Sequence, residues 1–534
     1  MKLNDEGLEN KKIWQDNAVE LPLFDRAIVR KKTKESPTWL HFGPGNIFRA
    51  FIASLQQTLL DNGLADTGII TAAPNGRDII DKIYKKHDDL SLLVTMYPDQ
   101  STRKKVIASI TESLGSQLGT EDWLRLQAIF RAPSLQIVSF TITEKGYKLR
   151  GSDGSYLPEV LLDMSAGPAK AQSFMARVTS LLYDRYLAGA EPVSLLSMDN
   201  CSHNGLILQA AVADIGAAWL KADLVEKSFT EYLAEKVAYP CSMIDKITPR
   251  PSEQVRDDLL AAGFENMDFV ASARGGSYAP FVNAEKTEYL VVEDLFPNGR
   301  PPLEKAGVIF TDRETVDRVE RMKVCTCLNP LHTALAVFGC LLGYTLIADE
   351  MANPQLKKLV EKIGLLEGMK VVTDPGVLNP ADFIEECLNQ RFPNPAIPDT
   401  PQRIACDTSQ KVGVRFGETI KAYQAATDLS AADLEYIPLA IAGWCRYLLG
   451  IDDEGNAFSV SPDPLLEKLQ GYLTGIHLGQ AGDIPAALQP ILSDVNIFGI
   501  DLYEAGLGQK IERYFAELCA GKKAVAKTLI KYTV

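Results

Sequence analysis

Three side chains suited to proton transfer stand close together in the second half of the chain. They are Lys323, Asn329 and His332, separated by five and then two residues. Pro330 fits the first position of a helix with Asn329 as its N-cap, and the apolar run 331–347 predicts a buried helix. Burial and a helix N-terminus both disfavour a charged ammonium, so such a lysine can exchange a proton with an alcohol or a ketone oxygen. The same spacing also fits an ordinary helix cap.

A glycine turn near the start of the chain is a second candidate site. An apolar strand from residue 38 runs into Gly43 and Gly45, and an amphipathic helix follows to about Leu60. A strand, glycine turn and helix open a dinucleotide-binding unit, in which a phosphate sits at the helix N-terminus. Phe48 replaces the third glycine of the GxGxxG fingerprint, which keeps this helix farther from its strand. Alone, the pattern also fits a purely structural turn.

The end of the next strand bears on the choice of coenzyme. That strand spans 67–73, and no Asp or Glu follows it before Asp78. An acidic residue at this point usually binds the ribose hydroxyls of NAD, whereas a nearby arginine accommodates the 2′-phosphate of NADP. Arg77 could approach such a phosphate, so the residues alone leave the preference open.

Further apolar runs complete a predicted sheet. We expect a strand pair over 92–107 and single strands over 136–143 and 192–198, alternating with helices. This alternation predicts a parallel, doubly wound sheet of the Rossmann type, whose ligands bind beyond the carboxyl ends of its strands. The polar segments 143–147 and 199–205 lie at two such ends.

The chain is predicted to fold as an α/β Rossmann-type domain followed by a mostly α-helical domain. Residues 1–37 form a charged lead-in, residues 38–302 the sheet domain and residues 303–534 the helical domain, with a hinge at 296–302. Long helical periodicities mark the second half, over 354–366, 431–449 and 511–533.

Composition narrows the class of protein. The net charge of −14 argues against nucleic-acid binding. The polar start argues against a signal peptide, and the longest apolar run, 334–348, is better explained as a core helix than as a membrane span. The nine cysteines and five histidines lack the spacing of disulfide frameworks or metal sites. We therefore expect a cytoplasmic protein with no catalytic metal.

Several landmarks in a fixed order give the chain a family resemblance. It resembles the polyol-specific long-chain dehydrogenases/reductases, the mannitol dehydrogenase family, from about residue 20 to the C-terminus. The landmarks are Leu21-Pro22 with Asp25-Arg26, the glycine turn, Thr143-Glu-Lys-Gly-Tyr147, Asp199-Asn200 with Asn204-Gly205, Ser242-Met-Ile-Asp245, Val292-Glu-Asp294, the Lys-Asn-His signature and Arg403 to Lys411. The resemblance implies hydride transfer to or from a nicotinamide coenzyme without a metal.

The resemblance also implies a role for each catalytic residue. Lys323 matches the general acid/base, while Asn200 and Asn329 match an amide pair that stabilises the reacting oxygen. His332 matches a substrate-orienting residue. Glu320 matches a proton gate, although it also fits a solvated charge. The site would thus combine residues of both domains.

The resemblance also implies which residues bind the substrate and the coenzyme. Asp245, in a predicted turn, matches a substrate-pocket position, and Arg403 and Lys411 match cations suited to sugar hydroxyls or a hexuronate carboxylate. NAD(H) is favoured by the resemblance, with NADP(H) left open. The expected coenzyme contacts are Gly43, Gly45, Asn46, Ile47, Phe48, Arg77, Thr143 and Glu144.

The substrate stays open within the family. The segment 197–205 resembles one branch of the family, and this resemblance implies interconversion of D-fructuronate and D-mannonate in hexuronate catabolism, with mannitol oxidation or tagaturonate reduction as alternatives. A non-catalytic paralogue that binds a nucleotide or sugar acid is a further alternative, and the intact Lys-Asn-His set argues against it. The partners expected are a small sugar acid or polyol and, at most, a few copies of the same chain. His203 matches no family landmark and is interpreted as a loop or cap residue.

Overall fold

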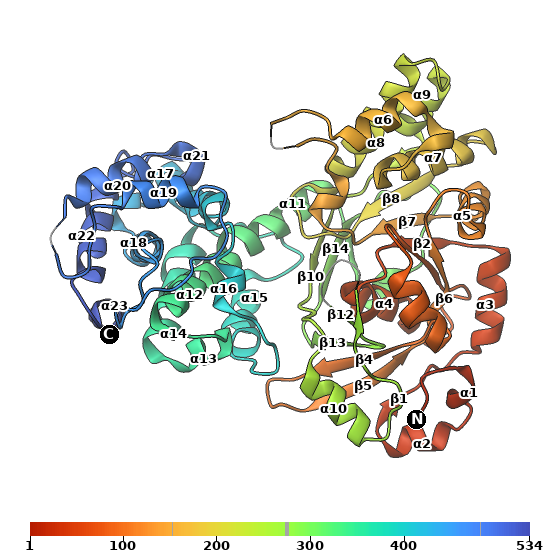
Figure 1. Cartoon of the computed structure of the whole chain (residues 1–534), viewed down its shortest axis with the longest axis horizontal. Helices are drawn as coiled ribbons and strands as arrows, with labels where there is room; N and C mark the ends of the chain where they lie inside the picture. Colours follow the sequence, from red (N-terminus) through yellow and green to blue (C-terminus); the bar gives the residue numbers. More distant parts are fainter. Residues whose placement is uncertain (152, 273–276, 481) are drawn as a thin grey trace. The chain divides into compact units, whose positions relative to one another are not determined.

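The computed structural model describes residues 1–151, 153–272, 277–480 and 482–534 and divides into two compact units (Figure 1). Unit 1 comprises Met1–Tyr97 and Ser101–Asp317, and unit 2 comprises Pro98–Gln100 and Arg318–Val534. Unit 1 thus includes the predicted lead-in and extends beyond the predicted boundary at residue 302. One reason is that β15 (Ile309–Thr311) pairs in parallel with β14 (Tyr289–Glu293) of the same unit.

The centre of unit 1 is a six-stranded sheet in which every strand pair is parallel. Its order is β6 (Ile110–Gly115), β3 (Ile69–Ala73), β2 (Trp39–Phe42), β7 (Ile137–Phe140), β8 (Val193–Ser197) and β9 (Val237–Ala238). Chain order reverses between β2 and β7, the position at which ligands bind in such sheets. The predicted Rossmann-type sheet is therefore confirmed.

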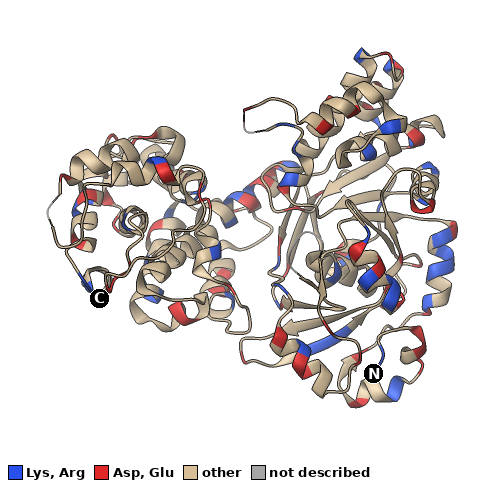
Figure 2. Ribbon diagram, viewed as in Figure 1, with Lys and Arg blue, Asp and Glu red and all other residues tan. Residues whose placement is uncertain are grey.

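Side chains alternate between the two faces of this sheet, and each face has its own core. Leu40 and Val138 contribute to a core with α5, α7, α8 and α9, whereas Trp39 and Ile137 contribute to one with the helix after the glycine turn. The helices are α5 (Glu121–Arg131), α7 (Phe174–Leu187), α8 (Asn204–Lys221), α9 (Lys227–Glu235) and α4 (Ala53–Asp61). The central strands β2, β3, β7 and β8 carry no charged residue, and both signs of charge intermingle on the helices (Figure 2).

Smaller elements complete unit 1. A four-stranded sheet has the order β1 (Val19–Glu20), β5 (Thr102–Ile107), β4 (Ser91–Met96) and β13 (Phe281–Glu285). The strand pair predicted over 92–107 is the antiparallel pair β4–β5. The other strands are β10 (Ser242–Asp245), β11 (Val270–Ala271) and β12 (Ser277–Tyr278), and the other helices are α1 (Asp5–Leu8), α2 (Lys11–Asp16), α3 (Arg26–Glu35), α6 (Pro158–Ala166) and α10 (Glu253–Ala261).

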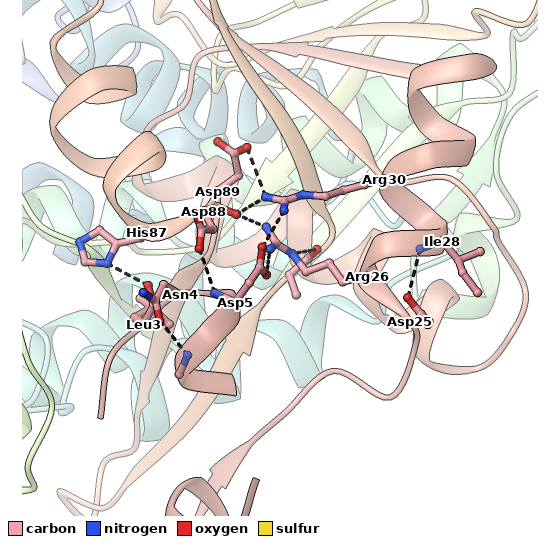
Figure 3. Close-up of polar contacts among 12 residues, drawn as sticks. Leu3, Asn4, Asp5, Asp25, Arg26, Ile28, Arg30, His87, Asp88 and Asp89 are labelled. Carbon is pink, nitrogen blue, oxygen red and sulfur yellow. Dashed lines mark hydrogen bonds and ion pairs between the residues drawn. The ribbon is translucent and has the colours of Figure 1, made fainter. Parts of the chain in front are cut away.

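The N-terminal segment is bound to unit 1 by a cluster of charged groups (Figure 3). Arg26 and Arg30, one turn apart on α3, both donate to the Asp5 carboxylate and to the carbonyl oxygen of Asp88. Arg30 also lies 3.7 Å from Asp89. Because most of these bonds join residues far apart in the sequence, the first 37 residues are an integral part of this unit rather than a separate lead-in.

Unit 2 is built from helices around α12 (Asn329–Leu342) and α18 (Tyr436–Tyr447). These two pack closely, since a Cβ at Gly443 would lie 2.5 Å from the Phe338 ring. The others are α13 (Ile347–Ala352), α14 (Pro354–Glu361), α15 (Pro380–Glu386), α16 (Pro401–Ile404), α17 (Glu418–Ala425), α19 (Leu466–Tyr472), α20 (Ile484–Leu492), α21 (Val495–Phe498), α22 (Gly508–Leu518) and α23 (Ala524–Thr533).

The segment before α12 is helical, and the predicted loop and Asn329 cap are wrong. The α-helix α11 (Arg313–Met322) continues into a π-helical turn, η7 (Lys323–Cys327), and only Leu328 interrupts it before α12. Pro330 does stand in the first turn, as predicted. By length and composition Arg313–Leu342 could cross a membrane, and 83% of its most apolar window is buried inside the protein.

Glycine and turn residues shorten other predicted helices. The helix predicted over 331–347 ends at Leu342, because Gly343 adopts a left-handed conformation with φ of 79°. The periodicity over 511–533 belongs to two helices, α22 and α23, separated by a segment that contains Gly521 with φ of 135°. Residues 431–449 likewise form a short 3₁₀ turn and then α18.

A buried carboxyl group marks the core of unit 2. Glu350 on α13 has no exposed surface, and a Cβ at Gly339 of α12 would lie 1.9 Å from its Oε1 atom. Burial, followed by the charges of Asp399 and Asp349, raises the pKa of Glu350 from 4.5 to about 10. The folded protein therefore holds a proton that the unfolded chain releases above pH 4.5.

This proton makes stability depend on pH. The free energy of unfolding is expected to fall by about 1.4 kcal/mol per pH unit between pH 6 and 8 through this group alone. Glu350→Gln, which stays neutral, should remove that slope in denaturant unfolding measured across this range. Glu385→Gln, at an exposed site on α15, is the control. Parallel pH profiles for wild type and Glu350→Gln would contradict the assignment.

Candidate active site

The glycine turn has the geometry of a phosphate cradle. Gly43 has φ of 115°, and a Cβ there would lie 2.1 Å from the Thr141 carbonyl oxygen. Gly45 is open, with no heavy atom within 4 Å of the Cβ position. The first helical bond runs from the Arg49 amide to Gly45, so the amides of 46–48 point out of the helix N-terminus. Open space before such amides suits the pyrophosphate of a dinucleotide.

The side chains after this turn are mostly structural. Phe48, predicted as a coenzyme contact, is fully buried and stacks on His41 with ring centroids 4.2 Å apart. Asn46 accepts a hydrogen bond from Arg49 and donates to the Pro249 carbonyl oxygen. Ile47 is half-buried at the start of the helix. Phe48 can therefore contact a coenzyme only through its backbone amide.

Arg77 follows β3, and carboxylates occupy its guanidinium. Nη2 lies 3.1 Å from Asp81, and Nη1 donates to Asp122. Nearby, Arg177 donates to the carbonyl oxygens of Pro74 and Ser116. Arg177 also borders a cavity of about 440 Å³, lined by Asn75, Gly76, Gln117, Leu118, Gln172 and Arg177. Its position beyond the carboxyl ends of β3 and β6 suits the adenosine half of a dinucleotide.

The loop after β7 contains a strained residue. Thr143 is exposed and has φ of 65° and ψ of 158°, a conformation that non-glycine residues rarely adopt. Its amide and that of Ile142 donate to the Asp199 carboxylate, each at 2.9 Å. Glu144, also exposed, lies 3.1 Å from Lys148. The loop thus presents Thr143 and Glu144 to solvent beside the glycine turn.

Asn200 is exposed directly after β8, where the sequence predicts it. The buried Asn204 fixes this segment, because Nδ2 donates to the carbonyl oxygens of Asp199 and Ser242, both at 3.0 Å. His203 has φ of 50° and makes no side-chain cap bond, and its Nδ1 atom lies 3.3 Å from Asp317. The prediction of a loop or cap residue is confirmed, because His203 occupies the N-cap position of α8, which it caps without a side-chain hydrogen bond.

Lys323 opens the π-helical turn η7 and is only 2% exposed. Asn329 is the first residue of α12 and is half-buried, and Glu320 lies one helical turn before Lys323 on α11. A π turn widens the helix and is frequently found at functional sites. Lys323 and Asn329 thus lie on one helical run, six residues apart, and their acid/base and oxygen-stabilising roles stay predictions.

His332 has an acidic partner that the sequence analysis did not predict. Nε2 lies 3.0 Å from Oδ2 of Asp399, at ion-pair distance, although the angle falls short of a hydrogen bond. The Phe392 ring packs against the imidazole, with centroids 5.2 Å apart. Nε of Arg403 donates to Oδ1 of Asp399 at 3.1 Å. Burial alone would raise the pKa of Asp399, but the imidazole and the guanidinium together hold it below its ordinary value.

The other two predicted substrate residues differ in setting. Lys411 is half-buried and donates to the Cys406 carbonyl oxygen at 2.6 Å, and burial followed by the charge of Arg415 lowers its pKa. Asp245 is buried at the end of strand β10, not in the predicted turn, because it pairs with Tyr289 in the sheet.

The structure therefore assembles two groups of predicted residues. Unit 1 brings the glycine turn and the Thr143 loop together, and unit 2 brings Arg403 to His332 through Asp399. Within the described ranges there is no group of three or more His, Cys, Asp or Glu residues that could hold a metal ion. Asp399 stands four residues before Arg403, and this acid–arginine spacing was the available sequence signal for it.

Fold and site together define the class of a dinucleotide-dependent dehydrogenase with a helical second domain. Residues 37–305 match the Mannitol dehydrogenase Rossmann domain, and residues 315–519 match the Mannitol dehydrogenase C-terminal domain. The chain belongs to the mannitol dehydrogenase family of oxidoreductases. The resemblance inferred from the landmarks is confirmed.

Curated relatives and solved structures support this membership along the whole chain. D-mannonate oxidoreductase of Thermotoga maritima is 53% identical over 531 residues, covering 99% of this chain and 98% of that protein. The D-mannonate oxidoreductase of Escherichia coli is 30% identical and covers 81% of this chain and 84% of that protein. Mannitol 2-dehydrogenase of Pseudomonas fluorescens, solved with NAD and D-mannitol, is 27% identical, with a TM-score of 0.75 over 99% of both chains.

Proposed function

We propose that this chain is an NAD(H)-dependent oxidoreductase that interconverts D-fructuronate and D-mannonate in the cytoplasm, in hexuronate catabolism. The observation that carries the proposal is the 53% identity to a D-mannonate oxidoreductase over nearly the full length of both proteins. The exposed Arg403 and the half-buried Lys411 support an acidic substrate. The nine free cysteines are in keeping with a reducing compartment.

The proposed chemistry distributes the reaction among a few side chains. The coenzyme, when bound at the glycine turn, supplies or accepts the hydride. Lys323 delivers a proton to the ketone oxygen during reduction and removes it during oxidation, as a general acid/base without a metal. The amides of Asn329 and Asn200 donate to that oxygen and stabilise its developing charge. His332 orients the substrate, and Glu320 passes the proton between Lys323 and solvent.

A substrate panel tests the proposal. Purified protein is mixed with NADH and D-fructuronate, D-tagaturonate or D-fructose, and absorbance at the NADH band is followed. D-fructuronate should give the highest kcat/KM. A preference for D-fructose would support the second candidate, mannitol 2-dehydrogenase activity, which the structural similarity to that enzyme favours. Binding of NADH without turnover of any substrate would identify a non-catalytic paralogue and overturn the proposal.

The surroundings of Arg77 support NAD(H) over NADP(H). The guanidinium that could meet a 2′-phosphate is paired with Asp81 and Asp122, and the Nη donors of Arg177 are directed at backbone carbonyls. A phosphate would have to displace these partners, whereas the ribose hydroxyls of NAD need only hydrogen-bonding groups such as the amides lining the adjacent cavity.

We expect kcat/KM with NADH to exceed that with NADPH by about tenfold or more. Asp122→Asn should lower the ratio of kcat/KM with NADH to kcat/KM with NADPH several-fold, because it weakens the hold on Arg77 and lets it approach a 2′-phosphate. Steady-state kinetics with both coenzymes measure this ratio. The neighbouring exposed Glu121→Gln is the matched control and should leave the ratio unchanged. Equal use of the two coenzymes by the wild type would contradict the preference.

A further inference from the structure

We propose that Asp199 is a positioning residue that shapes the coenzyme loop of unit 1 and thereby sets the coenzyme relative to the neighbouring amide of Asn200. The inference rests on the proposed function. In this proposal the residue acts through the loop and not through a contact of its own with substrate or coenzyme. Its carboxylate instead joins the segment that ends β7 to the segment that ends β8.

The Asp199 carboxylate is an acceptor for three groups of the loop after β7. Oδ1 accepts from the Thr143 amide at 2.9 Å, and Oδ2 accepts from the Ile142 amide at 2.9 Å and from the Tyr147 hydroxyl at 2.6 Å. The Tyr147 hydroxyl, which is buried, also lies 2.8 Å from Oγ of Ser197 on β8. One carboxylate thus fixes the beginning and the end of the loop.

These bonds hold a conformation that the chain would otherwise avoid. Thr143 has positive φ with extended ψ, and a β-branched residue in that region is strained. Such strain persists where surrounding contacts enforce it, and here its own amide is bound to Oδ1 of Asp199. Without the carboxylate, Thr143 would relax toward negative φ and the loop would change course.

The loop adjoins the phosphate cradle. Thr141, two residues before Thr143, donates from Oγ1 to the Gly43 carbonyl oxygen at 3.0 Å, and its own carbonyl oxygen leaves no room for a Cβ on Gly43. A shift of the loop would therefore displace the glycine turn as well. Thr143 and Glu144 are also the residues predicted to contact the coenzyme.

The backbone of Asp199 is fixed as firmly as its side chain. Its carbonyl oxygen accepts from Nδ2 of Asn204 and from the amide of Cys201, at 3.0 and 2.9 Å. Asn204 is bonded in turn to Ser242 of β10. The residue that holds the coenzyme loop is thus rigidly placed beside Asn200, so one network positions the loop and the amide.

The test compares NADH affinity in Asp199→Asn with that in a matched variant. Asn keeps the size of the side chain but turns an N–H group toward a backbone amide, so we expect the Kd for NADH, measured by fluorescence titration without substrate, to rise about tenfold or more. Asp61→Asn is the control. Asp61 also accepts from a backbone amide, that of Leu23, but at the far end of the helix that follows the glycine turn, roughly 20 Å away.

Two further readouts separate positioning from plain stability. A purely structural role would lower the melting temperature of both variants and leave the Kd for NADH near that of wild type, which would overturn the proposal. Tyr147→Phe removes a single hydroxyl and should raise the Kd about threefold, so it decides the question if Asp199→Asn does not fold; an unchanged Kd there would also overturn it. Because NADH binding needs no substrate, a failure of the proposed activity would show separately, as absence of turnover in the wild type.

Discussion

Replacing Lys323 by methionine is expected to lower kcat for ketone reduction by about 10³-fold while leaving the Kd for NADH unchanged. Lys323 is 2% exposed at the start of a π turn, so its side chain is shielded from bulk water, and Asn329 follows six residues later on the same helical run. Methionine keeps the length of the stem and fills the same space, so the change removes the proton donor without opening a cavity. NADH oxidation measures kcat, and fluorescence titration measures the Kd.

A second lysine gives a matched control for this change. Lys362 also opens a π-helical segment of unit 2, and its ammonium lies 5.0 Å from the Tyr436 ring centroid. Lys362→Met should alter stability at most and leave kcat near that of wild type. Comparable losses in the two variants would show that the lysine is structural, and retained activity in Lys323→Met would remove it from the acid/base role.

Replacing Arg403 by alanine is expected to reduce kcat/KM for D-fructuronate by about 10- to 100-fold, and that for D-fructose by far less. Arg403 is exposed, and its Nε and Nη2 groups are held by Asp399, so the donors on Nη1 are left to meet a substrate carboxylate. Because Asp399 also contacts His332, both substrates should lose some activity. The ratio of the two losses is therefore the informative quantity.

Two companion variants sharpen this comparison. Arg403→Lys keeps the charge but not the planar pair of donors, so it should fall between wild type and Arg403→Ala with the hexuronate. Arg513→Ala changes an exposed arginine on α22 and should affect neither substrate. Equal losses for D-fructuronate and D-fructose in Arg403→Ala would count against recognition of a carboxylate and favour sugar hydroxyls.

The sheet and its loops were predictable because their signals are local. Short apolar runs such as 136–143 and 192–198 end in polar residues, and parallel strands place those ends at one edge. The structure confirms that edge and puts Thr143 within reach of Asp199. The strain at Thr143 was not predictable, because it depends on a carboxylate 56 residues away.

The helical run around Lys323 shows where local reasoning fails. Pro330 was interpreted as the start of a new helix after a loop, yet α11 and the π turn continue almost to that proline. Proline is tolerated in the first turn of a helix. The non-helical backbone of the single residue Leu328 is enough to end the preceding helical run and to let α12 begin before Pro330. Tertiary packing decides whether a loop or a helix precedes such a proline, and the local sequence pattern contains no information about that packing.

Long-range partners explain what else was missed. Asp399 contacts His332, which is far from it in the sequence, through the packing of α16 against α12. Arg77 looked available for a phosphate until the structure placed Asp122 beside it. Both cases concern ion pairs. An ion pair changes what a charged residue can bind, but the residues next to it in the sequence do not indicate the distant partner.

Isotope transfer tests the central claim most directly. The protein is incubated with D-fructuronate and NADH carrying deuterium at both C4 positions, in the presence of a metal chelator, and the product is analysed by mass spectrometry. Direct, metal-independent hydride transfer predicts D-mannonate that carries deuterium at the former carbonyl carbon, formed at the same rate with the chelator as without it. Product without deuterium, or loss of turnover with the chelator, would contradict the account.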